Sequence, residues 1–287
     1  MVTSLLECKT ILVTGATSGI GRGIALRLLD RYPEVKLIVT GRRKQNLEEI
    51  VTKYGSSRVA AVPFDVYDIA NISKLAKSAI SCFDGTLDAV ILNAGMQRGF
   101  NFADPNAAIS VDFEALRMEL DVNYTSQVAL TQHLLPHLID IAKSGKPASI
   151  NFVTTSLALV PSKRGLNYSA SKAAMHSFIL SLRGQVDDFN RSGGGAELLG
   201  VTEIMPPLVE TELHDAKHQP DLAFDVKGHP PSAMTLEVFL DGVWEGWSRE
   251  GGPADEILVG AHTRSNWESV DRPRKEILAT MWSKQIM

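Results

Sequence analysis

The feature that most constrains the fold of this chain is a regular alternation between short apolar runs and stretches of helical periodicity. Such runs are typical of strands buried on both faces, and apolar residues at three- to four-residue spacing are typical of amphipathic helices. Strands that alternate with helices form right-handed crossovers, which build a parallel sheet covered on both faces. The expected strands are 9–14, 36–40, 59–63, 88–93, 148–154, 198–205 and 256–259; the expected helices begin near 20 and span about 45–54, 69–83, 113–142, 168–190 and 235–247, the longest with a kink at Pro136.

This pattern predicts one α/β domain over residues 1–287, built on a doubly wound parallel sheet of about seven strands. Residues 209–234 interrupt the pattern, because this stretch is rich in His, Pro, Asp and Lys, lacks periodicity and follows a strand end. Ligands of open parallel sheets bind outside the carboxyl ends of the strands, so we expect the stretch to be a substrate lid. The alternative is a surface excursion without a role.

Composition and charge exclude several classes of function. The chain is 44% apolar and 22% charged, and its net charge of -4, spread along the sequence, argues against a nucleic-acid partner. No apolar run approaches the ~20 residues of a membrane span, and the N-terminus lacks a secretory signal. Cys8 and Cys82 indicate neither a disulfide framework nor a zinc site. We expect a cytoplasmic protein without membrane or nucleic-acid partners.

A glycine-rich loop, Gly15-Ala16-Thr17-Ser18-Gly19-Ile20-Gly21, joins the first expected strand to the first expected helix. Glycine lets the backbone turn tightly and approach a phosphate closely, and the helix N-terminus favours negative charge. In this context the motif predicts a dinucleotide-binding loop, although its GxxxGxG spacing differs from the commoner GxGxxG.

The end of the second expected strand indicates which dinucleotide is bound. An acidic residue there would bind a ribose 2′-hydroxyl, whereas arginine suits a 2′-phosphate. This chain has Arg42 and Arg43, with no carboxylate before Glu48. We therefore predict NADP(H) as cofactor, with Arg42 ahead of Arg43 as the phosphate contact; a solvated loop charge is the alternative for each.

Tyr168 and Lys172 lie four residues apart at the start of an expected helix, so their side chains should share one face. The ordinary pKa of a phenol, about 10, makes it a poor acid at neutral pH. A nearby ammonium favours the phenolate, so we expect Lys172 to lower the pKa of Tyr168 and make it a proton donor and acceptor. The alternative is a surface Tyr and Lys on an ordinary helix.

Together, these motifs resemble the short-chain dehydrogenase/reductase superfamily. The matching residues occur in the family's order over nearly the whole chain: Thr14 to Gly21, Asp65-Val66 after the third strand, Asn93-Ala94-Gly95 after the fourth, Asn123 in the long helix, and Tyr168 with Lys172. The resemblance implies a single-domain Rossmann fold and reversible hydride transfer between a nicotinamide and a carbonyl or alcohol.

The resemblance also implies a role for each matching residue. Tyr168 would be the general acid/base, and Lys172 would hold the nicotinamide ribose and lower the pKa of the tyrosine. Asn123 would anchor a water of the proton relay. Asp65 and Val66 would flank the adenine, and Asn93, Ala94 and Gly95 would line the cofactor cleft.

The sequence departs from the family pattern at the hydroxyl that polarises the substrate carbonyl. In the family this hydroxyl usually belongs to a serine. Counting back from Tyr168 without a gap places this position at Thr155, whereas a one-residue deletion in 157–166 would place it at Ser156. Either O–H could donate to the carbonyl oxygen. Both are candidates, and Ser156 is slightly favoured as a serine.

A second departure is the Pro206-Pro207 pair after the sixth strand, where the family commonly has Pro-Gly. With Gly95-Met96-Gln97-Arg98 and the tail 255–260, it resembles the branch of the bacterial DltE oxidoreductases. The resemblance implies cofactor contacts in the segment that follows the sixth strand, by Pro206, Val209 and Thr211.

The substrate pocket is expected to be mostly apolar, and Arg98 beyond the cleft could receive an acidic group or be a surface charge. No metal is expected, because the histidines of the lid fit no ligand spacing. His176 is expected to face solvent or a subunit. The apolar residues expected in the pocket are Met96, Leu157, Leu159 and Leu208, and the lid histidines are His214, His218 and His229.

We therefore predict an NADPH-dependent ketoreductase acting on a small, hydrophobic carbonyl or alcohol. The alternative from another class is a non-catalytic NADP(H)-binding sensor or scaffold protein, although such relatives usually lose the Tyr or the Lys. An epimerase or dehydratase is disfavoured, since those relatives have longer chains and a GxxGxxG loop. The resemblance also implies a homodimer or homotetramer formed through the long helix and the Tyr168 helix.

Overall fold

The computed structural model describes residues 4–103, 111–192, 198–215, 233–249 and 255–283. Within these ranges the sheet has seven strands, all parallel, in the order β3-β2-β1-β4-β5-β6-β7. The strands are β1 (Thr10–Thr14), β2 (Lys36–Gly41), β3 (Val59–Pro63), β4 (Ala89–Leu92), β5 (Ala148–Val153), β6 (Leu199–Met205) and β7 (Glu256–Leu258). Every expected strand is confirmed to within one residue at each end.

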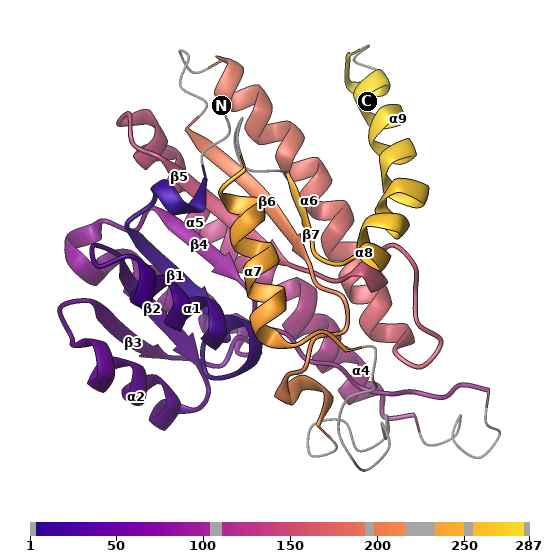
Figure 1. Cartoon of the computed structure of the whole chain (residues 1–287), viewed down its shortest axis with the longest axis horizontal. Helices are drawn as coiled ribbons and strands as arrows, with labels where there is room; N and C mark the ends of the chain where they lie inside the picture. The colour runs from indigo at the N-terminus through magenta and orange to yellow at the C-terminus, as the bar shows by residue number, and fades with distance from the viewer. Residues whose placement is uncertain (1–3, 104–110, 193–197, 216–232, 250–254, 284–287) are drawn as a thin grey trace.

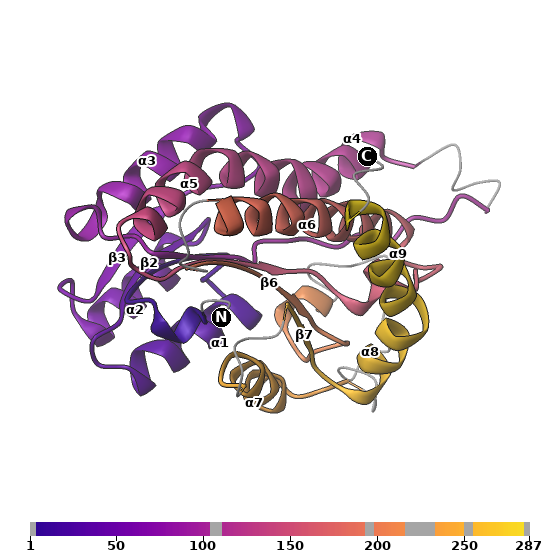
Figure 2. The same ribbon diagram turned by 90° about the horizontal axis from the view of Figure 1, so that it is seen from above.

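Helices cover both faces of this sheet, which confirms the doubly wound fold. Figure 2 shows α3, α5 and α6 on one face, and α1, α2 and α7 on the other. The helices are α1 (Gly19–Arg31), α2 (Lys44–Tyr54), α3 (Ile72–Ser81), α4 (Phe113–Leu120), α5 (Ser126–Lys143), α6 (Leu166–Ser192), α7 (Leu236–Trp247), α8 (Ala261–Asn266) and α9 (Arg272–Ser283).

The central strands read as mostly apolar runs because they contribute to two cores. Successive side chains of a strand point to opposite faces. In β1, Ile11 and Val13 belong to the core under α1 and α7, while Leu12 belongs to the core under α3, α5 and α6. All three are fully buried, and burying such a side chain contributes roughly 1.5–3 kcal/mol.

The strand order places a crevice at the carboxyl ends of β1 and β4. The chain runs from β1 outward to β2 and β3 and then returns to β4 on the other side of β1. The connections after β1 and after β4 therefore diverge to opposite faces, and this reversal is where ligands bind in such sheets. The glycine loop follows β1 and Asn93 follows β4, so both lie at this point (Figure 1).

The long expected helix 113–142 differs from the prediction. It is divided into α4 and α5 by a π-helical turn at Asp121–Thr125. The α5 helix runs through Pro136, so the interruption lies fifteen to eleven residues before the expected kink. A π turn accommodates one extra residue, and such turns are frequent at functional sites.

The chain after β7 is helical, which the sequence pattern did not indicate. It forms α8, a π-helical turn at Trp267–Asp271, and α9. The α9 helix packs against α6, where a Cβ on Gly184 would lie 3.0 Å from the Trp282 ring. None of the helices in the described parts of the chain is long and apolar enough to cross a membrane.

Candidate active site

The carboxyl ends of β1, β4, β5 and β6 enclose a cavity of about 600 Å³. The predicted site residues that line it are Gly15, Thr17, Ser18, Gly19, Ile20, Arg42, Arg43, Asp65, Val66, Asn93, Ala94, Gly95, Met96, Arg98, Thr155, Ser156, Leu157, Tyr168, Lys172, Pro206, Leu208, Val209 and Thr211. Gly21, Asn123 and the apolar residue Leu159 are not among the lining residues.

The glycine loop has a backbone that other residues would not allow. Gly15 and Gly19 have φ of 67° and 52°, in the left-handed region that favours glycine. A Cβ on Gly21 would lie 2.4 Å from the Asn93 side-chain nitrogen and 2.5 Å from the Gly15 carbonyl oxygen. Asn93 in turn donates from Nδ2 to the Thr14 carbonyl at 3.0 Å. Gly21 therefore lies on the side of the loop that packs against the protein, and Asn93 links the loop to the end of β4.

The two arginines after β2 differ in their contacts. Arg43 donates to Thr17 Oγ1 at 3.2 Å, contacts Ser18, and forms an ion pair with Glu212 at 2.6 Å. Arg43 thus joins the glycine loop to the segment after β6. Arg42 is exposed at the cavity edge, and in the described residues no hydrogen bond or ion pair of its guanidinium is present.

Tyr168 and Lys172 project from one face of α6 and are both buried. Lys172 Nζ donates to the Val153 carbonyl at 2.9 Å and lies 5.8 Å from the centre of the Tyr168 ring. Burial lowers the pKa of Lys172 to about 8, although the negative charges of Glu203 and Glu119 oppose this shift. The pair is thus brought together as expected from its spacing.

The expected lowering of the Tyr168 pKa is wrong for this structure. Burial, and then the negative charge of Glu119, raise the pKa of Tyr168 well above its ordinary value. Lys172 does not reverse this, because its ammonium is hydrogen-bonded to a backbone carbonyl rather than to the phenol. Tyr168 is therefore a neutral phenol at neutral pH, which is the form that donates a proton.

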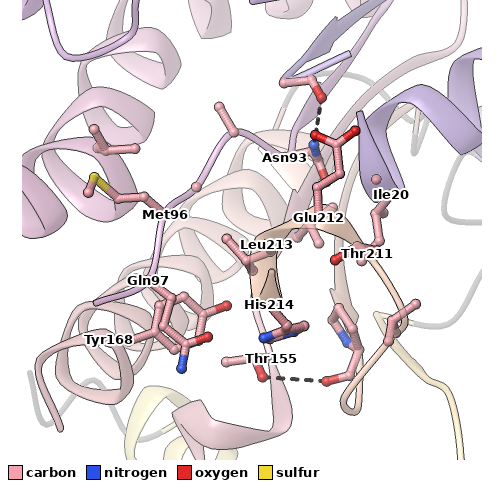
Figure 3. Close-up of a pocket in the computed structure, with 18 of the residues that line it drawn as sticks. Ile20, Asn93, Met96, Gln97, Thr155, Tyr168, Thr211, Glu212, Leu213 and His214 are labelled. Atoms are coloured by element: carbon pink, nitrogen blue, oxygen red, sulfur yellow. Dashed lines mark hydrogen bonds between the residues drawn. The ribbon is translucent and has the colours of Figure 1, made fainter. Parts of the chain in front are cut away.

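Both candidate hydroxyls lie on the cavity wall after β5. Thr155 Oγ1 accepts from Leu157 N at 3.3 Å and makes a long hydrogen bond of 3.5 Å to the Pro206 carbonyl. Ser156 begins the 3₁₀ turn Ser156–Ala158 that Thr155 caps. Figure 3 shows Thr155, His214, Gln97 and Tyr168 among the side chains that line the cavity. Gln97 and Tyr168 are neighbours, since a Cβ on Gly165 would meet both.

Asn123 lies inside the π turn and is fully buried. Its side chain accepts from Met96 N at 2.9 Å and donates to Met96 O at 2.8 Å and to Ser171 Oγ at 3.1 Å. These bonds hold the loop after β4 against α6. The amide is fully used by protein partners, so its side chain supports the cavity wall rather than lining it.

Glu119 is a functional candidate that the sequence reasoning missed. It is fully buried on α4, and its carboxylate accepts from Arg98 N at 2.7 Å and from Asn167 Nδ2 at 2.5 Å. Burial raises the pKa of Glu119 to about 6, although both hydrogen bonds oppose the shift. Its position one helical turn before Asn123 was a usable signal, because that spacing places both side chains on one face.

The expectation for His176 is also wrong. The side chain is 0% exposed, and its two ring nitrogens face carboxylates, Glu203 at 2.8 Å and Asp271 at 2.9 Å. Glu203 is a charged residue in the centre of a buried strand, and that was a signal for a buried partner. Asp271 lies in a part of the chain where no motif was recognised.

The segment expected to be a lid is described only at its two ends. After β6 the chain forms a 3₁₀ turn at Glu212–His214, and Leu213 and His214 line the cavity. Val209 pairs with Met234 in a parallel bridge, so the segment leaves and returns at one place beside the cavity. Residues 216–232, with His218 and His229, lie outside the described residues.

A family model described as short chain dehydrogenase matches residues 9–221, and the chain belongs to this family. The protein "Uncharacterized oxidoreductase DltE" of Bacillus subtilis (strain 168) is 32% identical over 238 residues, which are 83% of this chain and 85% of that protein. This confirms the resemblance to the superfamily and to its DltE branch. "Dehydrogenase/reductase SDR family member 7B" of Mus musculus is 31% identical over 281 residues, 96% of this chain and 74% of that protein.

Solved structures agree with this assignment. The closed form of serine dehydrogenase complexed with NADP+ is 26% identical, with a TM-score of 0.67, over 86% of this chain and 92% of that one. A short chain dehydrogenase from Burkholderia cenocepacia J2315 has a TM-score of 0.70 at 24% identity, over 96% of this chain and 98% of that one. At that identity the second match establishes the fold alone.

Proposed function

We propose that this protein is an NADPH-dependent oxidoreductase that transfers hydride between the nicotinamide and the carbonyl or secondary alcohol of a small substrate. The observation that carries the proposal is that Tyr168, Lys172 and the hydroxyls of Thr155 and Ser156 line one cavity with the glycine loop. The site fits a dinucleotide, since the glycine loop, with positive φ at Gly15 and Gly19, lines the cavity just before the N-terminus of α1.

When bound, the reduced nicotinamide supplies the hydride. Tyr168 donates the proton to the carbonyl oxygen, and its raised pKa keeps it in the donor form at neutral pH. Lys172, with a pKa of about 8, is mostly an ammonium at pH 7 and can hold the ribose hydroxyls and return a proton to Tyr168. Since the Asn123 side chain is used by Met96 and Ser171, we propose that a relay water would be held by the main chain of Asn123 in the π turn rather than by its amide.

The oxygen of the substrate carbonyl needs an O–H donor beside Tyr168, and we assign this role to Thr155. Its hydrogen bond to the Pro206 carbonyl is long, 3.5 Å, so the hydroxyl can turn toward a ligand at little cost. Ser156, the alternative, lies on the same wall. Met96, Arg98, Leu157 and Leu208 are proposed to form the substrate side of the cavity, beneath the two ends of the lid.

The preference for NADP(H) is supported by Arg42 and Arg43 at the end of β2 and by the NADP+ complex of the related serine dehydrogenase structure. Arg42→Asp should invert the ratio of NADPH to NADH efficiency, because a carboxylate repels the 2′-phosphate and accepts from a 2′-hydroxyl. Arg43→Asp would also break the contacts to Thr17 and Ser18, so Arg42→Asp is the cleaner test. An unchanged ratio in Arg42→Asp would remove the assignment of Arg42.

The central experiment follows NADPH and NADH absorbance over a panel of ketones, diketones and aldehydes, with wild type beside Tyr168→Phe. We expect NADPH-dependent turnover that falls by about 10²–10⁴ in the variant, while NADPH binding is retained. Tight NADPH binding without turnover of any carbonyl or alcohol, in either direction, would contradict the proposal and favour a sensor or scaffold.

A further inference from the structure

A cluster of buried charged side chains lies directly behind the Tyr168–Lys172 pair. His176 follows Lys172 by one turn of α6, and its Nδ1 is 2.8 Å from Glu203 Oε2 of β6. Its Nε2 is 2.9 Å from Asp271 Oδ1, in the π turn between α8 and α9. An ionised carboxylate can only accept hydrogen bonds, so both ring nitrogens must donate. The geometry therefore fits the protonated imidazolium.

Glu203 extends this cluster to the cavity wall. Its second oxygen, Oε1, accepts from the Thr154 hydroxyl at 2.5 Å. Thr154 lies between two residues of the site: the carbonyl of Val153 accepts from Lys172, and Thr155 carries the proposed donor hydroxyl. The position of residues 153–155 at the end of β5 therefore affects both the Lys172 ammonium and the Thr155 hydroxyl.

We propose that His176 is a positioning residue: a buried imidazolium that holds Glu203 and, through Thr154, fixes the segment Val153–Thr155 against Lys172. The inference rests on the proposed function of this site. It also makes the chain after β7 part of the support of the active site, because Asp271 supplies the second carboxylate.

The charges around the cluster determine its effect on Lys172. Glu203 and Glu119 face Lys172, and both favour its ammonium. Glu203 and Asp271 face His176, and Arg274 lies 3.5 Å from Asp271. Burial lowers the pKa of His176, but the hydrogen bonds and charges of the two carboxylates raise it to about 9. The cationic ring offsets the field of Glu203, so its loss should make the Lys172 ammonium more stable.

The first test is the protonation state of His176 in the wild-type protein, which needs no activity. Imidazole nitrogen chemical shifts, measured by NMR on ¹⁵N-histidine-labelled protein, should show both ring nitrogens protonated at pH 7.5. In Asp271→Asn the Oδ1 acceptor remains and the charge is lost, so the pKa of His176 should fall. A single protonated nitrogen in the wild type at pH 7.5 would overturn the proposal.

The second test is the pH profile of kcat/KM for carbonyl reduction, which should decline above the pKa of Lys172, about 8. In His176→Gln this decline should move to higher pH by more than about 0.5 unit, and kcat should fall about tenfold or more. The matched control is Arg183→Gln, which breaks another buried ion pair of α6, with Glu256 at 2.6 Å. A second control is His133→Gln at an exposed position of α5.

A purely structural His176 would give a variant like Arg183→Gln, with lower stability and an unmoved pH profile, and that result would overturn the proposal. If His176→Gln does not fold, the NMR titration of the wild type still decides. If the wild type binds NADPH but turns over no carbonyl, the proposed function fails, while the NMR result still decides whether His176 is a buried cation.

Discussion

At the scale of single residues, Thr155 and Ser156 carry neighbouring hydroxyls on one cavity wall. Removing a hydrogen-bond donor to the oxygen that gains charge in the transition state typically costs about 10²–10³ in kcat. We therefore expect Thr155→Val to lose about 10²-fold or more in kcat with NADPH affinity kept, and Ser156→Ala to remain within a few-fold of wild type.

Thr155→Ser is the control for this comparison, because it keeps both the O–H and the cap on Leu157 N. It should retain most of the activity that Thr155→Val loses. If Ser156→Ala instead abolishes turnover and Thr155→Val keeps it, the alignment with a one-residue deletion is right and Ser156 is the donor.

Glu119 affects Tyr168 by its charge, since it raises the pKa of the phenol after burial has done so. Glu119→Gln removes that charge and should lower the pKa of Tyr168. Alcohol oxidation needs the base form, so the rise of its kcat/KM with pH should move to lower pH. Glu114→Gln, at an exposed position of the same helix, should leave the profile unchanged. An unmoved profile in Glu119→Gln would show that its charge does not reach Tyr168.

The residues that sequence reasoning found are those whose role depends on local spacing, such as Tyr168 with Lys172 or the glycines after β1. Glu119, Glu203 and Asp271 were missed because their partners come from other elements. Spacing places Glu119 on the face of Asn123 and burial marks Glu203, but neither reveals which elements meet. The His176 error has the same origin, since its two carboxylates come from β6 and from the turn before α9.

At the scale of elements, the glycine loop and the start of α1 have the least room for change. In Gly21→Ala the new Cβ would lie 2.5 Å from a backbone oxygen of Gly15, which cannot move aside cheaply. We expect a loss of stability of about 1–3 kcal/mol and weaker NADPH binding, measured by urea denaturation and by fluorescence titration.

Gly23→Ala is the matched control on the same helix. Its Cβ would meet the flexible ends of Leu240 and Leu236, at 3.0 and 3.2 Å, which can shift. NADPH affinity should be unchanged in this variant. Equal losses of affinity in Gly21→Ala and Gly23→Ala would show that general strain in α1, rather than the loop backbone, causes the effect.

Strands were predictable because most of their residues are buried and apolar, although β6 also contains Glu203. The helix α9 was not predicted, although Ile277, Leu278, Met281 and Trp282 recur at helical spacing; none of its residues is buried. The π turn at Asp121–Thr125 was also invisible, since one extra residue shifts the phase of the helix by about 100° without leaving a composition signal.

At the scale of the whole molecule, we propose a dimer or tetramer in which α4 contacts a second copy. Phe113 is 74% exposed and Leu120 is 41% exposed, and two helical turns separate them on one face. Phe113→Glu with Leu120→Glu should give a monomer with unchanged secondary structure, measured by light scattering and circular dichroism. A wild-type monomer, or an oligomer that survives both changes, would contradict this arrangement.

The stability of the whole protein should depend on pH through His176. A group whose pKa rises on folding stabilises the native state fully below its unfolded pKa, and loses this effect as pH rises through its folded pKa. For His176 this stabilisation is lost between about pH 6.5 and about pH 9. The free energy of unfolding should therefore fall by about 2 kcal/mol between pH 6.5 and 8, as the shift of the pKa requires.

Lys172 has the opposite effect on the free energy of unfolding, and its effect occurs at higher pH. Burial lowers its pKa from 10.5 to about 8, so its contribution starts to rise near pH 7 and increases mostly above pH 8. Between pH 6.5 and 8 the effect of Lys172 is therefore smaller than that of His176 and opposite in sign. In urea denaturation at these two pH values, the decrease should be present in the wild type and in His133→Gln and absent in His176→Gln. Its persistence in His176→Gln would assign it to other groups, since a glutamine has no proton to lose.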